Sequence, residues 1–191
     1  MTILFINACV RADSRTKQLA DYVLKKNGAA VKEVCLAQAK ISPLDGAALE
    51  VRNRRAAADD FSDSMFDLAK DFAAAETIVI AAPYWDLSFP AALKSYIEAI
   101  NVIGLTFAYN KAGQPYGLCR AKKLIYVTTA GGLILDDAYG FGYIKALAHN
   151  FYGIQDIFYF KAEGLDFVGA DVKGILRAAE RKIDLERDLL K

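Results

Sequence analysis

The segment TIVIAAPYWDLSFP, residues 77–90, decides the fold prediction for this chain. It begins as an apolar run, which is typical of a strand buried on both faces of a sheet. A turn with two prolines, three aromatic residues and one acid follows, and a helical pattern starts at Ala91. A strand, a turn and a helix in this order predict a βα unit of a parallel sheet.

The same order recurs along the chain. The expected strands are residues 2–6, 31–36, 77–82, 123–129 and 157–160, and the expected helices are 16–26, 60–72, 91–103, 142–151 and 171–190. The connection 37–59 is expected to be only partly helical, and residues 105–117 suggest a hairpin-like excursion. Because parallel strands need crossovers that cover both faces, we predict an α/β fold. It is a flavodoxin-like doubly wound five-stranded parallel sheet, order 2-1-3-4-5, with helices on both faces and one domain over residues 1–191.

The composition of the chain limits the kinds of binding partner and the cellular compartment that we expect. The chain is 54% hydrophobic and 12% aromatic with a formal net charge of +1, which argues against disorder and against an electrostatic nucleic-acid binder. No apolar run reaches the roughly 18 residues that a membrane span needs, and the N-terminus has no signal-peptide pattern, so we expect a cytoplasmic protein. Cys9, Cys35 and Cys119 form no metal-binding or disulfide pattern and are expected to be reduced thiols.

Ligands of such sheets bind beyond the carboxyl ends of the strands, where the strand order reverses. Here that rule selects the loops at residues 7–16, 83–90 and 128–132. The first loop places Ser14, Arg15 and Thr16 at a helix start, where hydroxyls, N–H groups and the helix dipole suit a phosphate monoester. Taken alone, residues of these types at a helix start are more often a helix cap. The sequence has neither GxGxxG nor GxxxxGK[ST], so a mononucleotide fits better than a dinucleotide or ATP.

The other two loops suit a planar ring. The wall would be flat and apolar, formed by Tyr84, Trp85, Leu87 and Phe89, although aromatic residues after a strand more often belong to the core of a packing turn. Gly131 and Gly132 would let the backbone approach a ring edge closely, or would simply form a turn. A phosphate cradle, a ring wall and a close-approach turn at one edge together favour flavin mononucleotide (FMN).

The chain also resembles a known family over nearly its whole length. The matching segments are NACVRADSRTKQLAD (7–21), PYWDLSFPAALKSY (83–96), GLTFAYNKAG (104–113), TTAGG (128–132) and GIQDIFYFKAEG (153–164). They are similar to the flavodoxin-like NAD(P)H:quinone oxidoreductases, particularly to the FMN-dependent azoreductases that act as homodimers.

The resemblance implies a tightly bound FMN. The residues implied to hold it are Ser14, Arg15, Thr16, Pro83, Tyr84, Trp85, Asp86, Leu87, Thr129, Gly131 and Gly132. No catalytic side chain is certain because the flavin carries the chemistry, and Asp86 and Tyr109 are the candidates near the substrate. The family's excursion crosses to the partner's flavin, which implies that Tyr109 and Phe107, and more weakly Phe160, roof the partner's pocket.

The implied reaction is ping-pong. NADH or NADPH reduces the flavin and leaves, and a small aromatic acceptor then takes its place: a quinone, an azo compound or a nitroaromatic compound. Two alternatives stay open. One is a flavodoxin-like electron carrier, ranked second because such carriers use strongly charged faces. The other is a flavin-less dimeric binding protein.

Several positions depart from the family pattern, in which many relatives have other residues: Cys9, Val10, Asp86, Ala130 and Leu133. Asp86 stands in place of an asparagine, and its carboxylate would disfavour negative charge on a nearby reduced flavin. The only histidine, His149, lies outside the three loops and is expected to be structural.

Overall fold

Five parallel strands form the centre of the computed structural model, which describes residues 2–186. The strands are β1 (Thr2–Asn7), β2 (Ala30–Cys35), β3 (Thr77–Ala81), β6 (Lys123–Thr129) and β7 (Asp156–Ala162). Their order is β2-β1-β3-β6-β7, which confirms the predicted order 2-1-3-4-5. All four pairings are parallel, and β1 and β3 form neighbours in the middle of the sheet.

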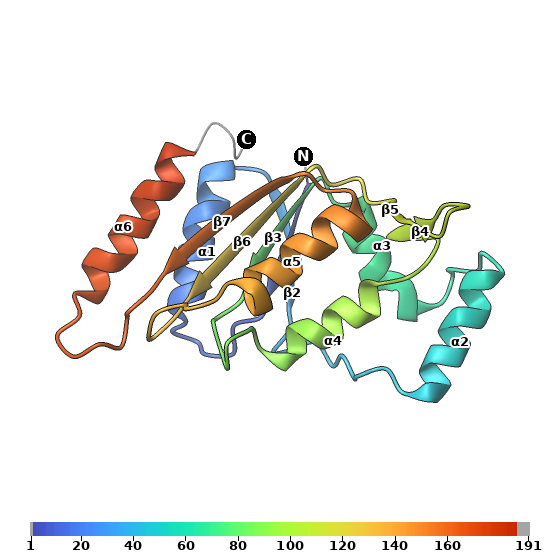
Figure 1. Cartoon of the computed structure of the whole chain (residues 1–191), viewed down its shortest axis with the longest axis horizontal. Helices are drawn as coiled ribbons and strands as arrows, with labels where there is room; N and C mark the ends of the chain where they lie inside the picture. The colour runs from blue at the N-terminus through green and yellow to red at the C-terminus, as the bar shows by residue number, and fades with distance from the viewer. Residues whose placement is uncertain (1, 187–191) are drawn as a thin grey trace.

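Helices cover both faces of this sheet, as Figure 1 shows. The helices are α1 (Arg15–Asn27), α2 (Gly46–Ala57), α3 (Asp67–Ala74), α4 (Ala91–Ile100), α5 (Tyr143–Leu147) and α6 (Val172–Leu185), and α2 alone of the labelled helices lies to the side of the sheet in Figure 1. Alternate strand residues point to opposite faces, so Ile3 and Phe5 pack with α1 and α6, whereas Leu4 and Ile6 pack with α3, α4 and α5. No helix within residues 2–186 is long and apolar enough to cross a membrane.

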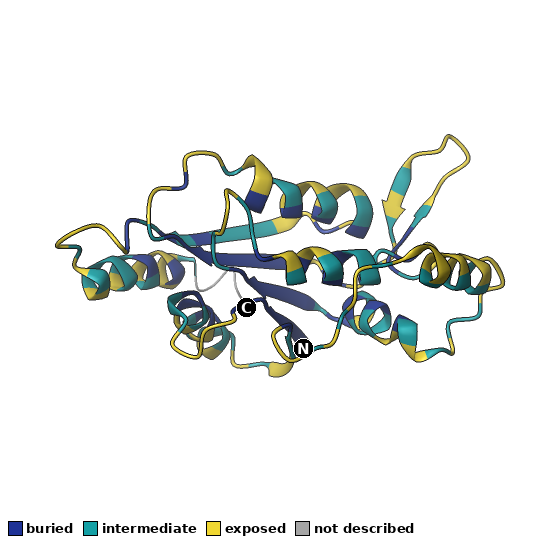
Figure 2. Ribbon diagram, turned by 90° about the horizontal axis from the view of Figure 1, so that it is seen from below, coloured by how far each residue is buried: buried dark blue, intermediate teal, exposed yellow. Residues whose placement is uncertain are grey.

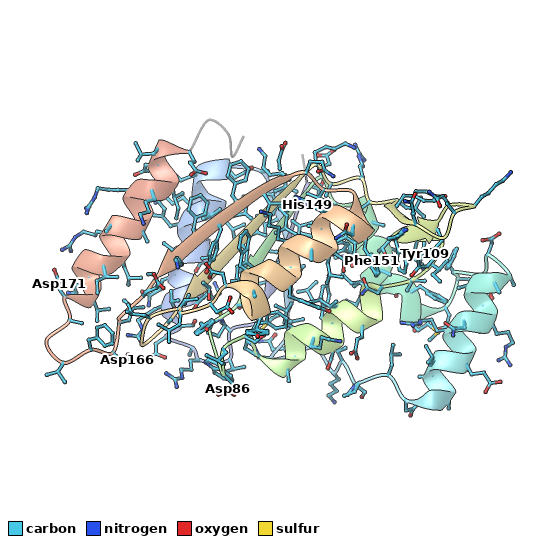
Figure 3. The ribbon with its side chains drawn as sticks, viewed as in Figure 1. Asp86, Tyr109, His149, Phe151, Asp166 and Asp171 are labelled. Carbon is cyan, nitrogen blue, oxygen red and sulfur yellow. The ribbon has the colours of Figure 1, made fainter. Side chains whose placement is uncertain are left out.

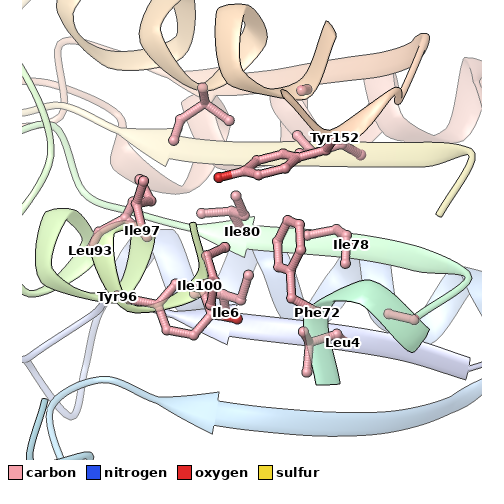
Figure 4. Close-up of a cluster of buried hydrophobic side chains, with 14 of the residues drawn as sticks. Leu4, Ile6, Phe72, Ile78, Ile80, Leu93, Tyr96, Ile97, Ile100 and Tyr152 are labelled. Atoms are coloured by element: carbon pink, nitrogen blue, oxygen red, sulfur yellow. The ribbon is translucent and has the colours of Figure 1, made fainter. Parts of the chain in front are cut away.

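The larger core lies under α3, α4 and α5. Figure 4 shows Phe72 and Tyr152 meeting over the strands, with their ring centroids 4.7 Å apart. Tyr96 of α4 is 1% exposed in the same core. Burying one such side chain stabilises the fold by roughly 1.5–3 kcal/mol, so this core holds the strands and thereby the loops that follow them. Figure 2 shows the sheet as the most buried layer.

Two predicted helices have different boundaries in the structure. The helix expected at 60–72 begins as a 3-10 turn at Ser64–Phe66, because the Asp60 and Asp63 carboxylates accept backbone N–H groups and favour turns. The helix expected to reach residue 103 ends at Ile100, whose carbonyl accepts the Thr106 hydroxyl at 2.7 Å.

The C-terminal half also departs in detail from the expectation. The helix predicted at 142–151 is a longer helical run, with π-helical turns at Ala138–Gly142 and Ala148–Tyr152 on either side of α5. The last strand is longer than residues 157–160 because it pairs with β6 along its whole length. The final helix was predicted to span residues 171–190, and the part of this prediction beyond residue 186 lies outside the described residues.

The excursion is a two-stranded antiparallel hairpin, as predicted, formed by β4 (Phe107–Tyr109) and β5 (Pro115–Gly117). Figure 2 shows it extending away from the sheet. Its base is anchored where Phe107 stacks on Phe151, with centroids 4.5 Å apart. Gly117 lies against the backbone of Tyr152, where an added Cβ would come within 2.1 Å of the carbonyl carbon.

Candidate functional site

A cleft of about 340 Å³ opens at the carboxyl edge of the sheet. It is lined by Val10, Arg11, Asp13, Ser14, Arg15, Thr16, Pro83, Tyr84, Trp85, Thr129, Gly131 and Asp166. The three predicted loops therefore meet in one place, as the position of the switch point requires. Of the predicted cofactor residues, Asp86 and Leu87 lie beside this cleft, in a neighbouring groove, and Gly132 does not line either.

The N-terminus of α1 forms one end of the cleft. Ser14 is the N-cap, and its Oγ accepts the Lys17 N–H at 3.3 Å, so the capping interpretation is confirmed. Within the described residues, the N–H groups of Arg15 and Thr16 have no hydrogen-bond acceptor. These N–H groups and the positive end of the helix dipole make the helix start an anion site as well as a capped terminus.

The floor of the cleft is a pair of threonines. The hydroxyl oxygens of Thr16 and Thr129 lie 2.6 Å apart, and the residues are 1% and 8% exposed. The Tyr84 N–H donates to the Thr129 carbonyl at 3.0 Å. Thr129 thus ties the end of β6 to α1 on one side and to the loop after β3 on the other.

The loop after β3 carries a tight turn. Trp85 and Ser88 exchange backbone hydrogen bonds of 3.0 and 2.7 Å, while Asp86 and Leu87 have φ of 50° and 65°. Two central residues with positive φ define the type I′ hairpin turn, in which aspartate is tolerated and leucine is rare. Trp85 is 39% and Leu87 57% exposed, so a turn made only for packing does not account for them. The Ser88 hydroxyl donates to the Tyr139 carbonyl at 2.6 Å and fixes the turn to the π-helical turn that precedes α5.

The glycine turn contacts a fourth loop, which the sequence did not indicate. The Gly131 carbonyl accepts the Asp166 N–H at 2.9 Å. A Cβ on Gly131 would lie 2.2 Å from the Asp166 carboxylate, so the close approach that this glycine permits here is to Asp166. Arg15 donates to the Leu165 carbonyl at 3.1 Å and to Asp166 Oδ1 at 2.7 Å. The Arg15 side chain, predicted to hold a phosphate, is therefore engaged by the β7–α6 loop.

Figure 3 separates the remaining candidates by position. Asp86 and Asp166 lie along the lower side of the view, near the carboxyl ends of the strands, whereas His149 lies on the upper side and Tyr109 to the right, both away from them. Tyr109 is 49% exposed, but Phe107 and Phe160 are buried in their own chain at 5% and 4%. These two phenylalanines therefore expose little surface to a partner, and their part in roofing a partner's pocket stays a prediction.

No cysteine is among the residues that line the cleft. Burial raises the pKa of Cys9 above its usual value and that of Cys119 to about 12, so both are protonated near neutral pH. Over residues 2–186, no group of three or more histidine, cysteine, aspartate or glutamate side chains is placed to hold a metal ion.

The family follows from comparison with known proteins. A profile described as "Flavodoxin-like fold" matches residues 1–185. The chain belongs to this flavodoxin-like family. FMN-dependent NADH:quinone oxidoreductase 3 of Pseudomonas fluorescens (strain Pf0-1) is 36% identical over 200 residues, covering 96% of each protein. FMN-dependent NADH:quinone oxidoreductase 2 of Clostridium acetobutylicum is 45% identical over 114 residues.

Not every match is full-length. The match covers only 56% to 64% of the length of three clostridial FMN-dependent NADH:quinone oxidoreductases, one from C. acetobutylicum and two from Clostridium perfringens. Among solved structures, the azoreductase of Bacillus anthracis str. Sterne has a TM-score of 0.85 at 20% identity over 99% of both chains. The FMN-dependent NADH-azoreductase of Bacillus anthracis str. Ames Ancestor, in complex with FMN, has a TM-score of 0.83 at 21% identity over 99% of this chain and 98% of that one. These two likenesses show the flavodoxin-like fold.

Proposed function

We propose that residues 1–191 form one FMN-binding domain that oxidises NADH or NADPH and reduces quinones, azo compounds or nitroaromatic compounds. The observation that supports this proposal most is the cleft, which has the free N–H groups of Arg15 and Thr16 at one end and an exposed Trp85 at the other. Its volume of about 340 Å³ falls within the range of roughly 300–1,000 Å³ that is usual for small-molecule sites. The names of the relatives give the reaction class.

The residues present fit FMN. The backbone N–H groups of Arg15 and Thr16, with the Ser14 hydroxyl, would hold the phosphate, because each of these groups can donate a hydrogen bond to an oxyanion. Trp85 would border the ring system with its exposed aromatic face. Tyr84 lines the cleft, and its hydroxyl is a buried atom without a hydrogen-bond partner inside the described part of the chain.

When bound, FMN supplies the two-electron chemistry, accepting hydride from the nicotinamide and passing electrons to the acceptor. The chain positions the reactants. Thr16 and Thr129 fix the floor, and the type I′ turn fixes the wall. The exposed Asp86 sets a negative charge beside that wall. A groove between Leu87 and Tyr139 adjoins the wall and offers apolar surface to a flat acceptor.

The proposal includes a homodimer in which the hairpin covers the partner's cleft. Large apolar side chains on and near the hairpin are exposed in one copy: Ile103, Tyr109, Tyr116 and Leu118. Exposed apolar groups gathered on one projecting element favour burial in an interface. A cytoplasmic setting suits the free thiols of the three cysteines, which stay reduced there.

Steady-state oxidation of NADH with menadione as acceptor tests the function. We expect turnover, with parallel double-reciprocal lines as the acceptor concentration is varied, which is the mark of ping-pong kinetics. Bound FMN without turnover on NADH or NADPH would support the electron carrier instead. A colourless protein that gains no thermal stability from added FMN would support the flavin-less binding protein.

A further inference from the structure

Asp166 of the β7–α6 loop, residues 163–171, occupies part of the candidate cofactor cleft. Its carboxylate lies against Gly131, in the space that a side chain at that position would fill. The backbone of the same loop is fixed there, because the N–H groups of Gly164, Leu165 and Asp166 donate to the carbonyls of residues 130–132. Asp166 is therefore held at the cleft wall by its own main chain.

The charges that line the cleft cancel. Two arginines, Arg11 and Arg15, face two aspartates, Asp13 and Asp166. Arg15 already donates to the Leu165 carbonyl and to Asp166. A phosphate carries a charge of about −1.5 to −2 at pH 7, so it meets a cleft with no net positive charge and an arginine that another anion has occupied.

The Arg15–Asp166 ion pair can be replaced by a ligand. Its nitrogen and oxygen are 2.7 Å apart, but the two side chains are 29% and 65% exposed. Ion pairs this exposed contribute little to stability because water screens them. A phosphate monoester offers the same guanidinium a higher negative charge than the carboxylate and three acceptor oxygens in place of two.

We infer that Asp166 sets the selectivity of the cleft for a phosphorylated over a non-phosphorylated flavin, by competing with the phosphate for Arg15. The inference rests on the proposed FMN-binding function. Removing the Asp166 charge then strengthens the binding of FMN and leaves that of riboflavin unchanged. From one unit of charge acting over several ångströms in partly solvated surroundings, we expect FMN to bind about fivefold more tightly.

The test is a titration of the flavin-free protein with FMN and with riboflavin, followed by quenching of flavin fluorescence. The measured quantity is the dissociation constant of riboflavin divided by that of FMN, determined for the wild type and for Asp166→Asn. Asp166→Glu keeps the charge and is expected to keep the wild-type ratio. Asp171→Asn is the matched control, because Asp171 ends the same loop, lies outside the cleft and caps α6, a role that asparagine performs equally well (Figure 3).

The outcomes are distinct. A riboflavin-to-FMN ratio of dissociation constants that rises about fivefold in Asp166→Asn, but not in Asp166→Glu or Asp171→Asn, supports the inference. FMN binding with an unchanged or reduced ratio in Asp166→Asn overturns the inference and leaves the proposed function standing. Failure of the wild type to bind either flavin overturns both. Asp166→Ser, checked for folding by circular dichroism, gives a second neutral side chain and must change the ratio in the same direction.

Discussion

The threonine pair on the cleft floor gives the sharpest prediction about stability. The hydroxyl oxygens of Thr16 and Thr129 are 2.6 Å apart and both residues are buried. Thr16→Val or Thr129→Val removes one partner and leaves the other hydroxyl buried without a hydrogen bond, which costs about 1–3 kcal/mol. Replacing both removes both polar groups while keeping the shape, so the double variant should cost clearly less than the sum of the single ones.

The assay is urea unfolding of the flavin-free protein, followed by circular dichroism, for the wild type, the two single variants and the double variant. We expect a coupling free energy of about 1–2 kcal/mol between Thr16 and Thr129. Thr128→Val is the matched control: Thr128 precedes Thr129 in β6 and points to the opposite face of the sheet, and its buried hydroxyl has no hydrogen-bond partner among residues 2–186. That variant should be neutral or more stable. Free energies of the single variants that simply add, within about 0.5 kcal/mol, would refute the coupling.

Three further predictions concern glycine and turn positions. Leu87→Val should lower the free energy of unfolding by about 1 kcal/mol, because a β-branched residue is strained at positive φ. The control is Leu133→Val, which should change it little, because Leu133 is equally exposed at 57% and is not among the positive-φ residues. Equal losses in the two variants would contradict this prediction. Gly117→Ala should cost about 2–3 kcal/mol in urea unfolding because backbone blocks the new Cβ, whereas Gly46→Ala, with open space around it, should be harmless. Asp86→Asn should retain FMN and stability but alter the rate of flavin reduction by NADH in stopped-flow absorption; an unchanged rate would show that this carboxylate is chemically silent.

The sheet was predictable from the sequence because continuous apolar runs alternate with amphipathic helices along the whole chain. Helix starts were less predictable. Periodicity at 60–72 includes Phe61, but the carboxylates of Asp60 and Asp63 bind nearby N–H groups and delay the helix to Ser64. Periodicity alone carries no information on such side-chain to backbone bonds.

The site was found because its three loops follow from strand order, and it was incomplete for two physical reasons. The type I′ turn at Asp86 and Leu87 lacks the Asn-Gly signature by which such turns are usually identified. Asp166 reaches the cleft only because Gly131 has no side chain. This contact joins two loops that are distant in the sequence, since Asp166 and Gly131 are 35 positions apart. The rule that ligands lie at the carboxyl ends of strands covers the loop after β7 as well, and it was the only available signal for Asp166.

The most direct test of the account is the visible absorption spectrum of the purified protein, before and after anaerobic addition of NADH. We predict the absorption bands of an oxidised flavin, their loss when NADH is added, and their return when a quinone follows. A protein that remains colourless after incubation with FMN, or flavin bands that neither NADH nor NADPH removes, would contradict the proposed oxidoreductase.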